Sequence, residues 1–236
     1  MRQPMTYERA IVIGGGMTGI LAAKVLSTFY HQVFIIERTK CQTLLRTVSA
    51  PSFHPHRMLP LGKQIVERLF PGYTKELLAM GGFNTLDQTS RFITKDGELT
   101  LTDTEETAVT RRAMLEWVLM QRMLNEGQAQ YLEKHEALSL QLKEGTNQVI
   151  GLVVKDRHEK PGCIFEMKAD LVIDTSGRMS KLPKWLKDAG LSLPQTDELS
   201  VTRLQHKILQ DTTRSAIPAI NGRRRSAGKA NPNRTV

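Results

Sequence analysis

The sequence has few cysteines, few aromatic residues and no long uninterrupted hydrophobic run. Its 236 residues include two cysteines, Cys41 and Cys163, whose separation matches neither a metal-binding nor a redox motif. A disulfide framework is therefore not expected, and a reducing compartment is favoured. The longest apolar run, residues 10–23, is broken by glycines and ends at Lys24, which makes it too short to span a bilayer. We expect a cytoplasmic protein without a transmembrane segment.

The charge is concentrated at one end of the chain. The formal net charge is +9, and residues 200–236 alone hold eight Lys and Arg against one acid, Asp211, so the rest of the chain is nearly neutral. A basic segment of this kind can bind nucleic acid, but no aromatic residue follows Trp185 to stack on bases. Since Gly, Ser, Asn, Pro and Arg accumulate there, residues 200–236 are predicted to be a disordered basic tail, and no nucleic-acid partner is expected.

The first forty residues predict a βαβ unit. Residues 10–13 are a short apolar run typical of a buried parallel strand, residues 18–28 have helical character, and residues 32–36 (QVFII) form a second buried strand. Strand, glycine turn, helix and strand fit within some thirty residues, as in a dinucleotide-binding unit. The fold class indicated is α/β, with a Rossmann-like parallel sheet.

The glycines between the first strand and the helix form the spacing GxGxxG. In such a motif Gly14 permits the tight turn, Gly16 lets the backbone approach a pyrophosphate, and Gly19 lets the helix pack against the strand. Glu37 ends the second strand eighteen residues after Gly19, where a carboxylate can accept hydrogen bonds from ribose hydroxyls. That carboxylate would repel a 2′-phosphate, which argues against NADP here. The alternative is a glycine turn that binds nothing.

The remainder predicts further regular elements. Pro51, Pro55 and Pro60 argue against any regular element over residues 40–60. Helices are expected at residues 62–70, 111–125 and 184–189, and a hairpin around Asp96-Gly97. Residues 137–174 contain three or four strand-like runs separated by turns, which indicates a small antiparallel β-meander.

Four stretches together resemble the FAD-dependent oxidoreductases of the aromatic-hydroxylase type, a superfamily that also includes geranylgeranyl reductases and flavin-dependent halogenases. They are AIVIGGGMTGILAAKVL with IIER, HPHRMLPLG with LFPGY, TRRAMLEWVL, and ADLVIDTSGRMSKLPKWL. They occur in the family's order and cover roughly residues 8–195. The resemblance implies FAD as the cofactor, with residues 1–199 as the FAD-binding domain.

The resemblance also assigns positions to the cofactor. The family's glycine motif holds the FAD pyrophosphate, its acid holds the adenosine ribose, and the arginine of an R-x-x-L-E pattern reaches the flavin. The matching residues here are Gly14, Gly15, Gly16, Met17, Thr18, Gly19, Glu37, Arg38 and Arg112. From the residues alone, a solvated charge on a helix is the favoured interpretation of Arg112, and the match to the family's pattern favours contact with the cofactor instead.

The second signature of the family departs from its pattern in this chain. The family has Asp-Gly before a serine, in contact with FAD and the reducing nicotinamide, whereas this chain has Ser176-Gly177 before Ser180. The resemblance therefore still assigns Gly177 to FAD, while NAD(P)H as electron donor is only a possibility. The W-x-W-x-I-P motif of halogenases is absent, because the only tryptophans are Trp117 and Trp185.

The function expected is that of an FAD-dependent oxidoreductase, monooxygenase-like (hydroxylase or epoxidase), acting on a small organic substrate. In such enzymes the reduced cofactor reacts with oxygen while the protein positions and desolvates, so no catalytic side chain is named. His54 and His56 lack a nearby third ligand, and no metal site is predicted. The Gly-Asp motif of the family's C-terminal part is also absent, so the alternative is a truncated, catalytically inactive FAD-binding fragment.

Overall fold

The computed structural model describes residues 7–40, 55–127, 129–158 and 161–196. The chain divides into two units, residues 1–194 and 195–236, and all that follows concerns the first. The predicted basic tail, residues 200–236, lies outside the described residues, as do Cys41 and His54.

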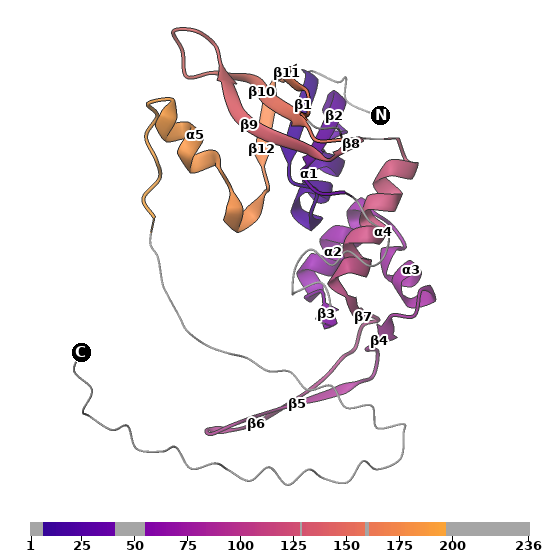
Figure 1. Ribbon diagram of the computed structural model, residues 1–236. Coiled ribbons are helices and arrows are strands. Elements are labelled where there is room, and N and C mark those ends of the chain that lie inside the picture. The colour runs from indigo at the N-terminus through magenta and orange to yellow at the C-terminus, as the bar shows by residue number, and fades with distance from the viewer. Residues whose placement is uncertain (1–6, 41–54, 128, 159–160, 197–236) are drawn as a thin grey trace, which may run out of the picture. The chain divides into compact units, whose positions relative to one another are not determined.

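The described part of residues 7–194 contains both helices and strands (Figure 1). The helices are α1 (Met17–Leu26), α2 (Pro60–Leu69), α3 (Tyr73–Ala79), α4 (Arg112–Asn125) and α5 (Leu182–Asp188). The strands are β1 (Tyr7–Ile13), β2 (Tyr30–Glu37), β3 (Pro55–Arg57), β4 (Phe83–Asn84), β5 (Thr89–Thr94), β6 (Gly97–Thr102), β7 (Ala108–Arg111), β8 (Gln130–Glu133), β9 (His135–Leu142), β10 (Val149–Asp156), β11 (Ile164–Lys168) and β12 (Leu171–Asp174).

Four parallel strands form the central sheet, in the order β12-β1-β2-β8. The predicted βαβ unit is confirmed as β1, α1 and β2, and Val12 pairs with Ile35 on one side and Ile173 on the other. Helix α1 packs on the sheet because its buried residues recur on one face: Gly19, Ile20, Ala23 and Leu26. The expected α/β class, with its parallel sheet, is confirmed.

The central sheet is buried on both faces, because alternate side chains of a strand point to opposite sides. Ala10 and Val12 belong to a core shared with the helices, while Ile11 and Ile13 belong to a second core shared with the meander β9-β10-β11. Figure 1 shows α1 beside β1 and β2, with α4 next to α1. Burial on both faces explains why the strands read as continuous apolar runs.

Two smaller sheets lie between α1 and β8 in the sequence. The hairpin predicted around Asp96-Gly97 is present as β5 and β6, with Gly97 at φ 146° in its turn. Strands β3, β7 and β4 form the other sheet, which corrects the expectation of no regular element over residues 40–60. Pro55 is tolerated because it is the first residue of an edge strand, where a missing N–H costs no ladder bond. Among the described residues, no helix is long and apolar enough to cross a membrane.

Candidate functional site

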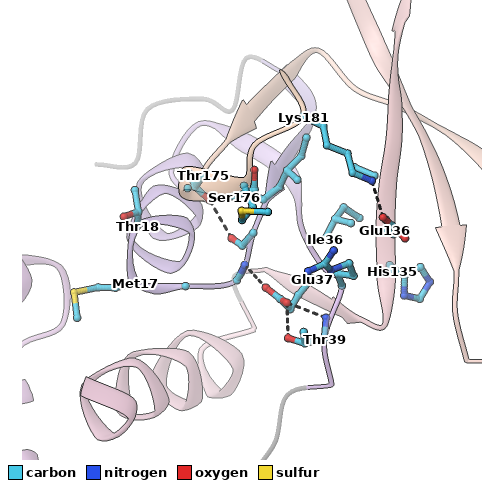
Figure 2. Close-up of a pocket in the computed structure, with 18 of the residues that line it drawn as sticks. Met17, Thr18, Ile36, Glu37, Thr39, His135, Glu136, Thr175, Ser176 and Lys181 are labelled. Carbon is cyan, nitrogen blue, oxygen red and sulfur yellow. Dashed lines mark hydrogen bonds and ion pairs between the residues drawn. The ribbon is translucent and has the colours of Figure 1, made fainter. Parts of the chain in front are cut away.

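A cavity of about 510 Å³ opens at the carboxyl ends of β1, β2 and β12. After β1 the chain crosses to β2 on one side, and it returns much later to form β12 on the other side of β1. Ligands of open parallel sheets bind at this kind of position, outside the carboxyl ends of the strands where the direction of winding changes. Figure 2 shows residues of β2, β9 and the segment after β12 around the cavity.

The turn from β1 into α1 requires two of its glycines for the fold itself. Gly14 has φ 100°, and a Cβ there would lie 2.9 Å from the Thr175 carbonyl oxygen. A Cβ on Gly19 would lie 1.9 Å from the carbonyl oxygen of Gly14, so only glycine lets the helix approach the turn this closely. These are the tight-turn and close-packing roles that the GxGxxG spacing predicts.

Gly16 differs from these two glycines because the fold does not require it. Its φ of −78° and ψ of −177° suit any residue, and among the described residues the nearest atom to a Cβ there would be a Glu116 carboxylate oxygen at 4.0 Å. Gly16 is also the N-cap of α1, where the first backbone amides of a helix have no acceptor within the helix. The turn therefore offers amide donors, the positive end of a helix dipole and unfilled space beside them, which suits a pyrophosphate.

Glu37 is held against the glycine turn by three hydrogen bonds. The Gly15 amide donates to one carboxylate oxygen at 2.8 Å, and the amide and hydroxyl of Thr39 donate to the other at 2.9 and 2.6 Å (Figure 2). The carboxylate thus lines the cavity in a fixed orientation at the end of β2. A Cβ on Gly15 would lie 2.0 Å from the Tyr131 hydroxyl, so Gly15, which lies between the first two glycines of the motif, is required by a side chain on β8.

The segment after β12 meets the glycine turn directly. The Thr175 hydroxyl lies 2.8 Å from the Ile13 carbonyl oxygen and 3.0 Å from that of Gly14, and the Thr175 amide donates to Ile13. Asp174 accepts from the amide and hydroxyl of Ser176 and from the Ser180 hydroxyl. Asp174 therefore organises the turn, while Thr175, Ser176 and Gly177 face the cavity.

A charged network that the sequence did not suggest forms another part of the cavity wall. Glu136 on β9 accepts from Lys181 at 2.8 Å and from Arg157 at 3.0 Å. The hydrogen bond from Lys181 lowers the pKa of Glu136, and the charges of Lys181, Arg157 and Arg38 act in the same direction against the effect of burial. The ion pair between Lys181 and Glu136 joins the segment after β12 to the meander. No local sequence pattern marks this pair, because the two residues lie 45 residues apart.

Arg112, the first residue of α4, lies at the cavity with its side chain paired to Glu116. Its Nε donates to a Glu116 carboxylate oxygen at 3.0 Å, the i,i+4 spacing that places two side chains on one helix face. The side chain of Glu116 is more buried than that of Arg112. The sequence allowed two interpretations of Arg112, a charge on the helix surface and a residue at the cofactor site. In the structure Arg112 forms an ion pair on the surface of its helix and also lines the cavity.

The structure brings nearly all of the predicted cofactor residues together. Those lining the cavity are Gly14, Gly15, Gly16, Met17, Thr18, Glu37, Arg38, Arg112 and Gly177. Gly19 lies behind the turn and packs against it. Lining residues that sequence reasoning missed are Thr39, His135, Glu136, Lys181 and Trp185. The roles assigned to the predicted residues remain predictions.

The comparisons with known proteins decide the family. Residues 7–213 match the family described as FAD binding domain. The chain belongs to this family. The resemblance stated from the four sequence stretches is thereby confirmed, and so is FAD as the expected cofactor.

Relatives of this family member are longer than it is. Protein Rv3254 of Mycobacterium tuberculosis is 28% identical over 209 residues, which cover 82% of this chain and 43% of that protein. The p-nitrophenol 4-monooxygenase PnpA of Pseudomonas putida has a TM-score of 0.56 at 15% identity, over 76% of this chain and 43% of its own. The flavin-dependent halogenase CmlS has a TM-score of 0.55 at 20% identity, over 79% and 32%. At such identities the structural likeness shows the fold alone, and this chain spans less than half of each relative.

Proposed function

We propose that this chain binds FAD in the cavity at the carboxyl ends of β1, β2 and β12, and that it works as an oxidoreductase of the monooxygenase type on a small organic substrate. The observation that carries the proposal is Gly16, whose missing Cβ leaves space that no atom of the described residues fills. A glycine that the fold does not require, placed at a helix N-terminus, favours a ligand that needs close backbone approach.

Different residues around the cavity would bind different parts of the cofactor. Gly16 and the first amides of α1 would hold the pyrophosphate, where the helix dipole favours negative charge. Glu37 would accept hydrogen bonds from the adenosine ribose, because its carboxylate is already oriented by Gly15 and Thr39. Arg112 would reach the flavin half, while Gly177 would let the backbone of the second stretch approach the cofactor.

When bound, FAD supplies the electron transfer and the reaction with oxygen, which amino-acid side chains cannot supply. The contribution of this chain is then to bind, to orient and to exclude water. A monooxygenase and a halogenase both have this fold, so the fold does not distinguish between the two reactions. Of the two, the monooxygenase reaction is the one that we propose. NAD(P)H is the electron donor that we propose.

Turnover by the FAD-loaded 236-residue chain tests this function. We expect that NADH or NADPH oxidation, followed at 340 nm, and oxygen uptake both increase when a member of a panel of phenols is added, with a hydroxylated product. Free FAD at the same concentration and the Arg112→Gln variant serve as controls. FAD-loaded protein that consumes neither NADH nor NADPH with any member of the panel would favour the alternative, an FAD-binding fragment without turnover.

A further inference from the structure

Three side chains that can bind metals meet where β9 and β10 pair, next to the cavity. His135 begins β9, Asp156 ends β10, and His158 follows two residues later. Asp156 is the register partner of His135, so the two side chains leave the same face of the antiparallel pair. One ligand atom from each of the three residues lies within 4.8 Å of the other two.

Backbone hydrogen bonds hold this corner in place. The Arg157 amide donates to the Lys134 carbonyl at 2.8 Å, and the Asp156 amide donates to the Cys163 carbonyl at 2.8 Å. The His158 amide donates to a carboxylate oxygen of Asp156 at 2.8 Å, which fixes the turn that carries the second imidazole. The Arg157 side chain, which lies between Asp156 and His158 in the sequence, is paired with Glu136, so a carboxylate balances its charge.

The orientation of the His135 ring is the second observation. Its Nδ1 lies 2.7 Å from the Glu133 carbonyl oxygen, so the Nδ1 proton is donated to the backbone and Nε2 carries the lone pair. Histidines that bind metals usually donate their other ring N–H to a carbonyl or a carboxylate in this way, which fixes tautomer and ring direction. The His158 ring lies at 66° to the His135 ring with 5.5 Å between centroids, so the rings meet edge to face rather than stacked.

We propose that His135, Asp156 and His158 form a binding site for a divalent transition metal, represented by Zn²⁺. Two imidazole nitrogens and one carboxylate oxygen match the ligands that Zn²⁺ takes, and three protein ligands leave a fourth position for water. Mg²⁺ and Ca²⁺ prefer sites made of oxygen ligands and should not compete.

His158 holds the carboxylate of this site in place. Its backbone amide and its ring Nδ1 lie 2.8 and 2.7 Å from the same Asp156 carboxylate oxygen, so Nε2 is the His158 nitrogen that would bind the metal. His135 also lines the cavity of the proposed FAD site, so the metal site would adjoin the cofactor. The metal proposal does not depend on FAD, and its test uses protein without the cofactor.

Calorimetric titration with ZnCl₂ tests the proposal on the full chain, freed of any histidine tag and treated with a chelator. We expect one saturable site that MgCl₂ does not fill. Since loss of even a supporting partner costs about 10–100-fold in metal affinity, Asp156→Asn and His158→Asn should each weaken Zn²⁺ binding at least about tenfold. The matched controls are His31→Asn, at an exposed histidine on β2, and Cys163→Ser, at the exposed thiol, and both should bind like the wild type.

A second measurement needs no variant and therefore does not depend on variants folding. Co²⁺ in a site of this ligand set should give visible absorption that saturates at one ion per chain and disappears when Zn²⁺ is added. Absence of saturable Zn²⁺ and Co²⁺ binding would overturn the proposal. So would wild-type affinity in both cluster variants, or a loss with His31→Asn or Cys163→Ser as large as with His158→Asn.

Discussion

At the level of single residues, the requirement for glycine differs among positions 14, 15 and 16. Gly14 is required by a positive φ and Gly15 by the ring of Tyr131, whereas no contact within the described part of the chain requires Gly16. The spacing GxGxxG does not predict that position 15 must be glycine, because Tyr131 is on β8, 116 residues away in sequence. Substitutions can therefore separate what the fold needs from what the cofactor needs.

Gly15→Ala should destabilise the protein through Tyr131. The new Cβ would lie 2.0 Å from the phenol oxygen, and forced overpacking of this kind costs about 1–3 kcal/mol of unfolding free energy. We expect this cost, measured by urea unfolding, to shrink when Gly15→Ala is introduced into Tyr131→Ala, so that the double-mutant cycle shows coupling. Equal costs in both backgrounds would contradict the contact.

Arg112→Gln tests whether the arginine acts on the cofactor or only on its own helix. Loss of a hydrogen bond to a charged group costs about 1.5–3 kcal/mol, so FAD affinity should fall roughly tenfold or more. The neighbouring Arg111→Gln is a matched control, because Arg111 is exposed and does not line the cavity. FAD titrations that give the same dissociation constant for both variants would leave Arg112 as a surface charge paired with Glu116.

At the scale of elements, Glu67 joins two helices. It lies near the end of α2 and accepts from the backbone amides of Gly72 and Thr74 at the start of α3, at 2.8 and 2.6 Å. Burial opposes ionisation of Glu67, but the hydrogen bonds from Thr74 and Gly72 and the charge of Arg122 outweigh it, and the pKa of Glu67 is lowered. This carboxylate replaces the missing side-chain cap of α3, since Gly72 is its N-cap.

Glu67→Gln should lower the unfolding free energy at pH 7 by about 1–2 kcal/mol, as loss of a helix cap does. Because the folded-state pKa is depressed, the stabilisation by Glu67 is complete above its ordinary pKa of 4.5 and is lost as the pH falls through the folded-state value. In urea unfolding, the difference in unfolding free energy between the wild type and Glu67→Gln should therefore become smaller as the pH falls from 7 to acid values.

The control is Glu105→Gln, which removes an exposed ion pair with Lys63 and should change the unfolding free energy by less than about 1 kcal/mol. A constant difference between wild type and Glu67→Gln across this range would contradict the linkage.

Sequence patterns predicted those elements whose signals are local. The βαβ unit, the hairpin at Asp96-Gly97 and helix α4 follow from periodicity and turn residues, and the structure confirms them. Helix α3 was missed because Pro71-Gly72 reads as the end of a helix, whereas here it separates two. Strand β8 was missed because four residues, Gln130–Glu133, carry no clear alternation and owe their place to pairing with β2.

The candidate site likewise contains residues that a local sequence pattern predicts and residues that only tertiary contacts bring to the cavity. Its glycines and Glu37 belong to one continuous motif, so spacing alone locates them. Glu136 and Lys181 belong to different segments that meet only through the packing of β9 and the turn after β12, and His135 and Tyr131 likewise reach the cavity through tertiary contacts. Long-range contacts of this kind leave no periodic signal in one sequence.

At the scale of the whole molecule, the hairpin of β5 and β6 is a separate feature from the cavity. All its residues except Ser90 are exposed, including Phe92, Ile93 and Leu99, and none lines the cavity. Its ends are close, because the Asp103 backbone amide donates to the Gln88 carbonyl oxygen at 2.9 Å.

Replacement of Thr89–Thr102 by a short Gly-Ser linker should therefore leave the dissociation constant for FAD unchanged. The exposed apolar side chains would be lost with the hairpin, so binding of the dye ANS should decrease. Fluorescence titrations with FAD and with ANS measure both effects. Weaker FAD binding in a shortened chain that keeps its circular dichroism and unfolding temperature would contradict a cofactor site confined to the carboxyl ends of the parallel strands.

If the turn after β1 and the turn after β12 form one FAD site in this chain, the 236-residue protein should bind FAD in a fluorescence titration. We predict saturable binding in the micromolar range or tighter. Gly16→Ala should keep the unfolding temperature but weaken FAD binding, while the control Gly62→Ala, where a Cβ would meet Met58 at an ordinary 3.7 Å, should keep both. A folded wild-type protein that does not bind FAD, or a Gly16→Ala variant that binds it as tightly, would contradict the account.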